Sequence, residues 1–451
     1  MIIQMSNTSL TILLCVTMLQ NFTCGAQSVT KISGGEYHSL FLKSDGSLWA
    51  MGWNQSGQLG DGTSNSANFW PEQIIASNVT AIAAGWQHSL FVKNDGSLWV
   101  MGYNHDGELG DGTFNNTNIP EQIVASNVVA VSGGDYHSLF LKSDGSLWAM
   151  GGNYYGELGD KTYNNTNRPE QIVSSNVTAI AAGDEHSLFL KSDGSLWGMG
   201  QNFNNQLGSA GGNQPKQIVP SNVIAIAAGQ LHSLFVKSDG SLWAVGYNGA
   251  GQLGDGTYNL QTNLPEKIVP SGVTAVAAGI DHSIFLKSDG SLWAMGSDQF
   301  GQLGDGANLS GGYNGSTNSP VQIVASGVTA IAAGAYHSLF LKNDGSLWGM
   351  GYNAWASLGD GTLNPTNQPE QIVVGTQSYN KIFGQFLSGS NMRLSFFGNA
   401  GANYALDRSF TLTAANWIPQ MTNFAGAGGA LVFTNTPNAA NNNFWRIRSV
   451  P

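Results

Sequence analysis

Cysteine and charge are both scarce in this chain of 451 residues. Only two cysteines occur, Cys15 and Cys24, and both precede residue 27. The chain downstream of them has no thiol, which excludes disulfides, thiolate metal sites and cysteine nucleophiles from that part. Charged residues make up 10% of the sequence, against roughly 25% in an average soluble protein. We therefore expect packing, and not charge, to supply most of the stability.

Basic residues are outnumbered, and the formal net charge is −11. An acidic surface repels phosphate backbones, so we expect no nucleic-acid partner. The apolar run at residues 10–19 is too short to span a bilayer and has the length of a signal-peptide core. We predict a signal peptide over 1–26, secretion or delivery to the cell envelope, and no transmembrane segment after its removal. Because residues 1–26 contain no Lys or Arg, a misassigned start and a retained leader stay open.

One sequence stretch, GGEYHSLFLKSDGSLWAMG at residues 34–52, occurs seven times in the chain with few changes. The repeated histidines lie 50, 49, 49, 46, 50 and 55 residues apart. This period is typical of propeller blades. The histidines are His38, His88, His137, His186, His232, His282 and His337.

Each unit contains four strand-like pieces, which predicts about 28 short strands in an all-β fold. Asp45-Gly46 is a strong signal for a two-residue hairpin turn between the two central pieces. The flanking strands are apolar on both faces, whereas a sheet with one solvated face alternates. Seven stacked sheets that close into a ring bury both faces, so we predict a seven-bladed β-propeller.

The same pattern bears on how the ring closes. The piece Val-Thr-x-Ile first appears at residues 29–32, before the first histidine, and no eighth copy follows residue 373. We expect each blade to begin at the histidine strand, so that the strand at 29–32 completes the last blade. The alternative is that each blade begins at the Val strand, in which case no N-terminal strand would complete the last blade.

Each unit also carries Gly-x-x-His-Ser, followed by Gly-x-Asn-x-x-Gly-Gln-Leu-Gly, as at residues 246–254, or a close variant of it. Over residues 28–375 the chain resembles the regulator of chromosome condensation repeat family. The resemblance implies a seven-bladed β-propeller, here assigned to residues 27–375. The best-known role in that family is guanine-nucleotide exchange on a small GTPase in the nucleus, which an exported acidic chain would not perform.

The seven histidines are interpreted as structural residues. One histidine per blade is too dispersed to converge on an ion at the bond lengths of about 2 Å that zinc requires. His38 and Ser39 are consecutive in a strand and point to opposite faces, so they form no base–nucleophile pair. Asp61 of the Leu-Gly-Asp-Gly-Thr loop is interpreted as a turn residue, since calcium usually takes several carboxylates. We expect no enzymatic activity, no metal and no cofactor.

Two windows vary among the otherwise uniform units, one between Gly and His and one after the Trp strand. Both are rich in Tyr, Trp, Asp and Asn, and aromatic residues with a polar edge dominate binding hot spots. We predict a binding face on these loops; the alternative is drift in exposed loops, with some aromatics covering neighbouring strands. The candidate binding residues are Tyr37, Trp53, Trp86, Tyr103, Tyr136, Tyr154, Tyr155, Phe203, Tyr247, Phe300, Tyr336, Tyr352 and Trp355.

After residue 375 the repeat stops, and residues 376–451 are similar to small β-sandwich modules that end secreted bacterial repeat proteins. This segment holds Lys381, Arg393, Arg408, Arg446 and Arg448 against Asp407 alone. Attachment to an anionic envelope polymer and docking on the acidic propeller are both compatible with that charge, as is a small stable module with scattered arginines.

These observations favour a non-enzymatic, exported scaffold whose loop face binds a protein. A carbohydrate-binding propeller is the first alternative, because Trp and Tyr beside Asn and Asp also suit sugar rings and hydroxyls. A regulator resembling a guanine-nucleotide exchange factor is the second, if the leader is not cleaved.

Overall fold

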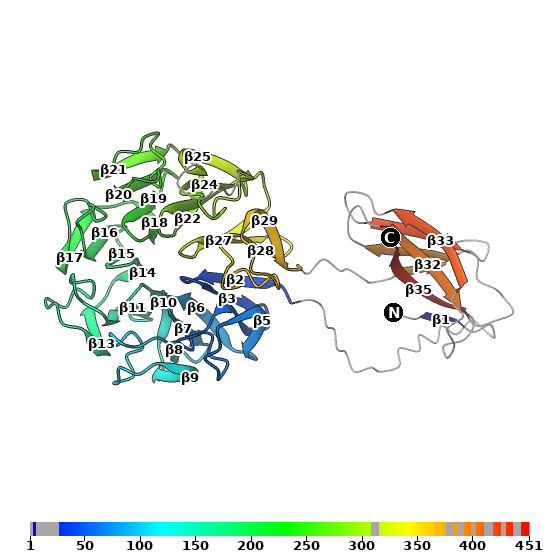
Figure 1. The fold of residues 1–451 in the computed structure, drawn as a ribbon, viewed down its shortest axis with the longest axis horizontal. Helices are drawn as coiled ribbons and strands as arrows, with labels where there is room; N and C mark the ends of the chain where they lie inside the picture. The colour runs from blue at the N-terminus through cyan, green and yellow to red at the C-terminus, as the bar shows by residue number, and fades with distance from the viewer. Residues whose placement is uncertain are drawn as a thin grey trace. The chain divides into compact units, whose positions relative to one another are not determined.

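The computed structural model describes residues 27–307 and 315–375 in full, and elsewhere only the backbone of short strands. The chain divides into two units, residues 27–375 and a second unit of residues 1–26 with 376–451. The first unit contains seven four-stranded antiparallel sheets arranged around an axis, as Figure 1 shows. The all-β, seven-bladed propeller is confirmed.

Within each sheet the strands run outward from the axis in chain order. The innermost strands are β2 (Val29–Gly34), β6 (Val79–Ala84), β10 (Val128–Gly133), β14 (Val177–Ala182), β18 (Val223–Ala228), β22 (Val273–Ala278) and β26 (Val328–Ala333). The second strands are β3 (His38–Lys43), β7 (His88–Lys93), β11 (His137–Lys142), β15 (His186–Lys191), β19 (His232–Lys237), β23 (His282–Lys287) and β27 (His337–Lys342).

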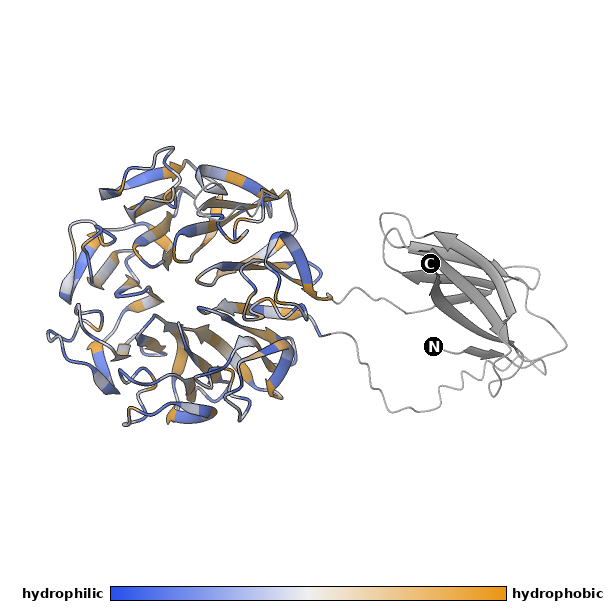
Figure 2. Cartoon of the chain, in the orientation of Figure 1, coloured by the Kyte–Doolittle hydropathy of each residue, from blue (hydrophilic) through white to orange (hydrophobic). Residues whose placement is uncertain are grey.

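The two outer strands of each blade carry the Trp and the Pro-Glu-Gln segments. The third strands are β4 (Leu48–Trp53), β8 (Leu98–Gly102), β12 (Leu147–Gly151), β16 (Leu196–Gly200), β20 (Leu242–Tyr247), β24 (Leu292–Gly296) and β28 (Leu347–Gly351). The outermost are β5 (Ala67–Ile75), β9 (Thr117–Val124), β13 (Thr166–Val173), β17 (Gly212–Val219), β21 (Gln261–Val269), β25 (Thr317–Val324) and β29 (Thr366–Val373). Figure 2 shows hydrophilic colour along these outermost strands and the loops, interrupted by hydrophobic patches.

The core lies between neighbouring blades. Phe91 and Met101 of the second blade pack with Leu40 and Leu42 of the first, and all four side chains are at most 2% exposed. Within a blade, Phe91 also stacks on Trp99 with ring centroids 6.1 Å apart. The apolar residues on both faces of the central strands are therefore buried, one face against each neighbouring sheet.

The predicted closure of the ring is wrong. The first sheet is β2-β3-β4-β5 and the last is β26-β27-β28-β29, so every blade begins at its Val strand. The physical reason is the short link at residues 35–37, which holds β2 antiparallel to β3 with Ile32 opposite Phe41. The ring closes instead through side chains and loops: the Val29 N–H donates to the Gly345 carbonyl at 3.0 Å, and that of Gly361 to the Phe69 carbonyl at 3.0 Å.

The second unit contains two sheets, with strand orders β1-β35-β32-β33 and β30-β31-β34. Its strands are β1 (Ile3–Met5), β30 (Phe383–Phe386), β31 (Met392–Phe397), β32 (Asn403–Ser409), β33 (Ile418–Phe424), β34 (Ala430–Asn435) and β35 (Asn443–Val450). The predicted β-sandwich stays a prediction, and the basic residues named for this segment lie outside the residues whose side chains are described. In the described part of the chain, no helix has the length and apolarity to cross a membrane.

Candidate functional site: the channel mouth

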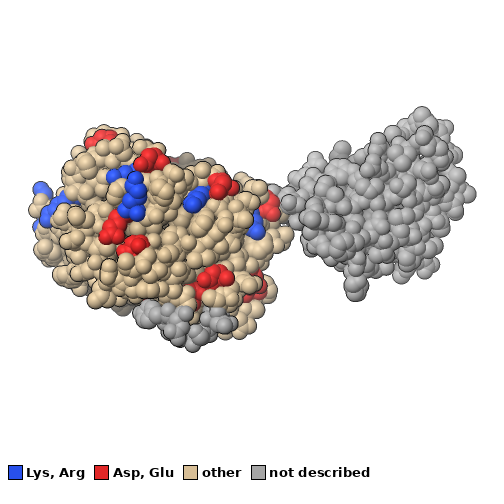
Figure 3. Space-filling model, turned by 90° about the horizontal axis from the view of Figure 1, so that it is seen from above, with Lys and Arg blue, Asp and Glu red and all other residues tan. Residues whose placement is uncertain are grey.

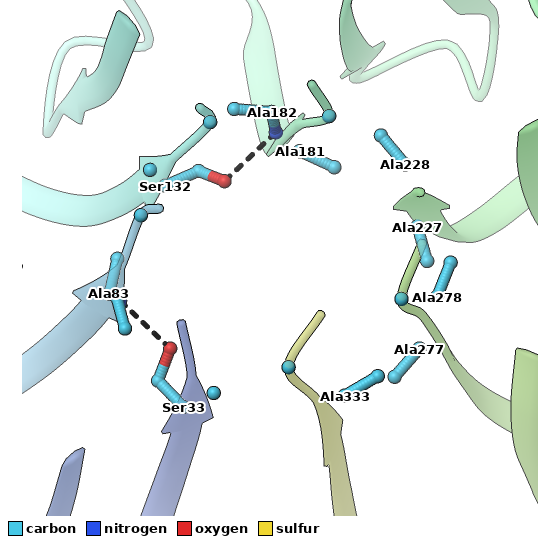
Figure 4. A pocket seen from close by; sticks show the side chains of 18 of the residues that line it. Ser33, Ala83, Ser132, Ala181, Ala182, Ala227, Ala228, Ala277, Ala278 and Ala333 are labelled. Carbon is cyan, nitrogen blue, oxygen red and sulfur yellow. Dashed lines mark hydrogen bonds between the residues drawn. The ribbon is translucent and has the colours of Figure 1, made fainter. Parts of the chain in front are cut away.

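The inner strands surround a central channel with a cavity of about 450 Å³. Figure 4 shows that its wall consists mainly of small side chains, among them Ala83, Ala181 and Ala227. The two serines in the wall, Ser33 and Ser132, each accept a hydrogen bond at 2.9 Å from a backbone N–H of the next blade. The wall thus offers methyl groups and hydroxyls that are already engaged.

One end of the channel is formed by the window between Gly and His, where the inner strand has ended. The first window residues line the channel there: Glu36, Trp86, Asp135, Asp184, Gln230, Ile280 and Ala335. We call this end, together with the loops after the third strands, the channel mouth. Both predicted windows therefore lie on the same end of the propeller.

Six of the thirteen candidate binding residues meet in one aromatic cluster. The ring of Tyr37 lies 6.0 Å from that of Tyr336, 5.9 Å from that of Trp53 and 5.4 Å from that of Tyr352. Phe300 lies 5.3 Å from Tyr336 and 5.0 Å from Tyr352 between ring centroids. The sixth member, Trp355, lies 6.1 Å from Trp53. Blades six, seven and one thus supply one wall of the mouth.

The other candidates form smaller groups. Trp86 packs on Tyr136 at 5.3 Å between centroids. Tyr155 packs edge-on against Phe203 at 5.6 Å, and Phe203 is 74% exposed. Three more candidates have local partners: Tyr103 stacks on His105 at 4.6 Å, Tyr154 donates a hydrogen bond to Asp106 at 2.6 Å, and Tyr247 covers the backbone of Gly249.

The channel mouth also contains carboxyl groups, which the candidate residues predicted from the sequence do not include. Burial raises the pKa of Glu36 to about 7, and the charge of Asp184 adds to the increase. Burial and then the neighbouring Glu185 raise the pKa of Asp184 to about 7. Burial also raises the pKa of Asp281. The signal was present in the same windows, since four of the seven contain an Asp or Glu.

Several polar atoms of the mouth have no partner. Among the described residues, no hydrogen-bond partner reaches the buried indole N–H groups of Trp53 and Trp86 or one buried carboxylate oxygen of Asp184. Buried polar groups are normally satisfied, so each of these has a cost of about 1–3 kcal/mol. A ligand that reaches them would recover that free energy.

The opposite end of the blades has a different chemistry. Each second strand ends in a lysine whose ammonium lies over the Trp ring of the third strand, as for Lys43 over Trp49 at 3.6 Å and Lys191 over Trp197 at 4.0 Å. Such cation–π contacts contribute about 0.5–1 kcal/mol at exposed sites. In Figure 3, which views the molecule at right angles to Figure 1, Lys and Arg lie interspersed with Asp and Glu on a mainly uncharged surface.

The seven histidines form a closed hydrogen-bonded ring at the blade interfaces. Each Nε2 lies 2.8–3.0 Å from the serine hydroxyl of the following blade, from His38 with Ser89 around to His337 with Ser39. Each serine hydroxyl donates its single proton back to a carbonyl of the preceding blade, for example Ser187 to Glu157 at 2.7 Å. The imidazole Nε2 must therefore be the donor, which assigns the neutral Nε2–H tautomer.

The second ring nitrogen of these histidines, Nδ1, has a different environment. All seven Nδ1 atoms are buried without a hydrogen-bond partner in the part of the chain that the structure describes, and all seven histidines are 0% exposed. Protonation would bury a charge and leave an N–H with no acceptor. Burial accordingly lowers the pKa of His137 and His186 to about 3 and that of His88 to about 4. Within residues 27–307 and 315–375, no group of three His, Cys, Asp or Glu residues could hold a metal ion.

Comparison with known proteins agrees with this architecture. The family model described as RCC1-like domain matches residues 15–225. Two models of the regulator of chromosome condensation repeat match residues 223–252 and 273–302, and residues 239–286 and 289–341. Together they cover most of the propeller.

Individual relatives are distant or short matches. A stretch of 41 residues is 51% identical to the X-linked retinitis pigmentosa GTPase regulator homolog of Caenorhabditis elegans, and it spans 9% of this chain and 3% of that protein.

Among solved structures, human WBSCR16 superposes with a TM-score of 0.65 at 24% identity over 73% of this chain and 94% of its own. Prp20p of Saccharomyces cerevisiae superposes with a TM-score of 0.65 at 21% identity over 79% of this chain and 90% of its own. At these identities the two structures show the shared fold, while the family models identify the repeats: the chain belongs to the regulator of chromosome condensation repeat family.

Proposed function

We propose that this protein is a non-enzymatic scaffold that recognises a protein partner through the channel mouth. The observation that carries the proposal is the aromatic cluster of blades six, seven and one, set beside buried carboxyl groups whose pKa values are raised. Aromatic side chains on a rigid frame lose little entropy on binding and are typical hot spots. The seven-fold framework supplies that rigidity.

The carboxyl groups favour a partner that places a basic side chain at the mouth. Glu36 and Asp184 are costly to ionise in the free protein because burial opposes their charge. A Lys or Arg from a partner would compensate that charge and pair with the carboxylate oxygen of Asp184 that has no partner. Charge complementarity of this kind sets specificity and association rate.

Removal of two stacked rings tests the proposal. The double variant Tyr37→Ala/Tyr336→Ala is expected to weaken partner binding at least 30-fold, because truncation of a hot-spot residue typically costs about 2 kcal/mol or more. Partners captured from the native extract by the wild type are identified by mass spectrometry, and their affinities are measured by calorimetry. Trp70→Ala is the matched control, since Trp70 is 66% exposed on an outermost strand.

The charge contribution has its own test. Glu36→Gln/Asp184→Asn is expected to lower affinity for the same partner about tenfold or more and to reduce its dependence on salt. Equal affinity of this variant and the wild type at low salt would show that the partner brings no basic group to the mouth. Binding that survives both double variants would overturn the proposed function.

A carbohydrate ligand and a GTPase partner are outcomes that the same protein can be tested for. Glycan-array binding that free sugar competes would favour a lectin. Prp20p is described with its binding to Gsp1p and histones, and stimulated nucleotide release from a small GTPase would favour a regulator of that kind.

We propose export, to be checked by mass spectrometry: a mature N-terminus at Gln27 supports it, and an intact Met1 in the cytosol contradicts it.

A further inference from the structure

The sixth blade departs from the others at one buried position. Two positions after the glycine at the end of the third strand, six blades have an asparagine, and the sixth blade has Asp298. Asp298 is 1% exposed. The six asparagines are Asn54, Asn104, Asn153, Asn202, Asn248 and Asn353.

The asparagine amide holds the following loop together. In the fifth blade, Asn248 Oδ1 accepts a hydrogen bond from the Leu253 N–H at 3.0 Å. Its Nδ2 donates to Asp255 at 3.0 Å and to the carbonyl and hydroxyl of Thr257 at 3.3 and 3.4 Å. One NH₂ group thus faces several oxygen atoms.

In the sixth blade a carboxylate oxygen replaces that NH₂ group. Asp298 Oδ1 keeps its bond from the Leu303 N–H at 2.8 Å. Oδ2 is buried, and no N–H or O–H group of the described residues donates to it. The Asp305 carboxyl lies close enough to hydrogen-bond to it only while one of the two is protonated, and burial with the charge of Asp305 raises the pKa of Asp298 to about 7.

The second blade shows which residues lie next to this position. In the second blade, the side-chain NH₂ of Asn104 donates to the Asn115 carbonyl at 3.1 Å, and its backbone N–H donates to Asn116 Oδ1 at 2.9 Å. The equivalent residues of the sixth blade are Gly315 and Ser316. A Cβ built on Gly315 would lie 3.6 Å from Asp298 Oδ2, and the hydroxyl of Ser316 is buried with no hydrogen-bond partner among the described residues.

We propose that this position binds a calcium ion between Asp298 and Asp305, with the Ser316 hydroxyl and water as further ligands. A cation removes the repulsion between two carboxylates and satisfies oxygen atoms that no donor reaches. Calcium takes six to eight oxygen ligands in flexible geometry and accepts water among them. Asp305 is exposed, so ions and water can reach the site, and the amide at the same position makes a cation unnecessary in the other blades.

Calcium titration of the full-length, chelator-treated protein tests the site. At pH 7.5 we expect one calcium per chain by calorimetry and a rise in Tm of about 2 °C at ten times the Kd. Asp298→Asn restores the amide of the other blades, so it should fold and lose both effects. Asp305→Asn should bind at least tenfold more weakly, and Asp255→Asn, the matched change in the fifth blade, should bind like the wild type.

Three results would overturn the calcium site. The first is no binding to the wild type at about 10 mM calcium chloride. The second is equal binding to Asp298→Asn. The third is a Tm that does not depend on calcium and that rises as pH falls from 8 to 6 in the wild type but not in Asp298→Asn. That result would show that a shared proton, and not a cation, satisfies the carboxyl groups of Asp298 and Asp305.

Discussion

Acidification below about pH 4.5 is expected to unfold the propeller steeply, because the folded ring excludes protons that the unfolded chain binds. Burial lowers the pKa of the ring histidines to about 3 or 4, whereas an unfolded histidine titrates near 6.5. Their stabilising effect is therefore complete above pH 6.5 and is lost as pH falls toward the folded pKa. Each histidine contributes about 1.4 kcal/mol for each pH unit in that range.

Buried carboxyl groups oppose this loss over part of the range. Burial raises the pKa of Glu36 and Glu157 to about 7 and that of Glu108 to about 8. A raised pKa in the folded state favours folding as pH falls from 8 toward the unfolded value, which lies near 4.3 for Glu. The two effects partly cancel between pH 7 and pH 4.5. Below pH 4.5 the unfolded carboxyls are protonated as well, so the histidine effect continues unopposed. Turn aspartates such as Asp95 and Asp144, whose pKa values are lowered by hydrogen bonds from Ser97 and Ser146, add to the loss there.

Urea unfolding at a series of pH values measures this. The expected free energy of unfolding falls from pH 7 to pH 5 by less than the histidines alone would give, and it drops by several kcal/mol for each pH unit below about 4.5. A free energy that stays constant down to pH 3.5 would show that the ring histidines are not held neutral.

Loss of a single ring histidine has the second largest expected effect. His137→Ala should lower the free energy of unfolding by about 3–5 kcal/mol, because it removes a buried hydrogen bond and leaves a cavity. The ring of His137 lies against Gly134, where an added Cβ would come within 2.5 Å of its Cε1 atom. Ser187 would lose its donor, at the interface between the third and fourth blades.

His105→Ala is the matched control, since His105 is the one histidine outside the repeat phrase and is exposed. Its replacement should change the free energy of unfolding by no more than about 0.5 kcal/mol. Similar losses for the two variants, measured by urea unfolding at pH 7.5, would mean that the ring contributes no more than a surface residue does.

The repeat pattern predicts the blades well because each local signal agrees with the global fold. Asp45-Gly46 forms a turn in which Gly46 has φ of +76°, and the apolar strands beside it are buried on both faces. The repeat pattern could not predict how the propeller ring closes. A circular repeat gives the same pattern from any starting strand, and only the pairing of β2 with β3 decides where a blade begins.

The candidate site was partly predictable. Differences among the seven units pointed to the loops of the channel mouth, but not to which rings meet. Tyr37 and Tyr336 come from opposite ends of the repeat and stack only because the first and seventh blades are neighbours in the closed ring. Asp298 was visible as the single Asp at an Asn position, yet its meaning depends on the oxygen atoms around it in the folded loop.

We infer that the repeated residues build the ring and that the residues that vary among the blades are left for recognition. Nitrogen-15 NMR of histidine-labelled protein at pH 5 tests it most directly, since it distinguishes protonated imidazole from each neutral tautomer. We expect seven imidazoles in the neutral Nε2–H form, with His105 as the exposed reference. Protonated ring histidines in the folded protein at that pH would contradict it.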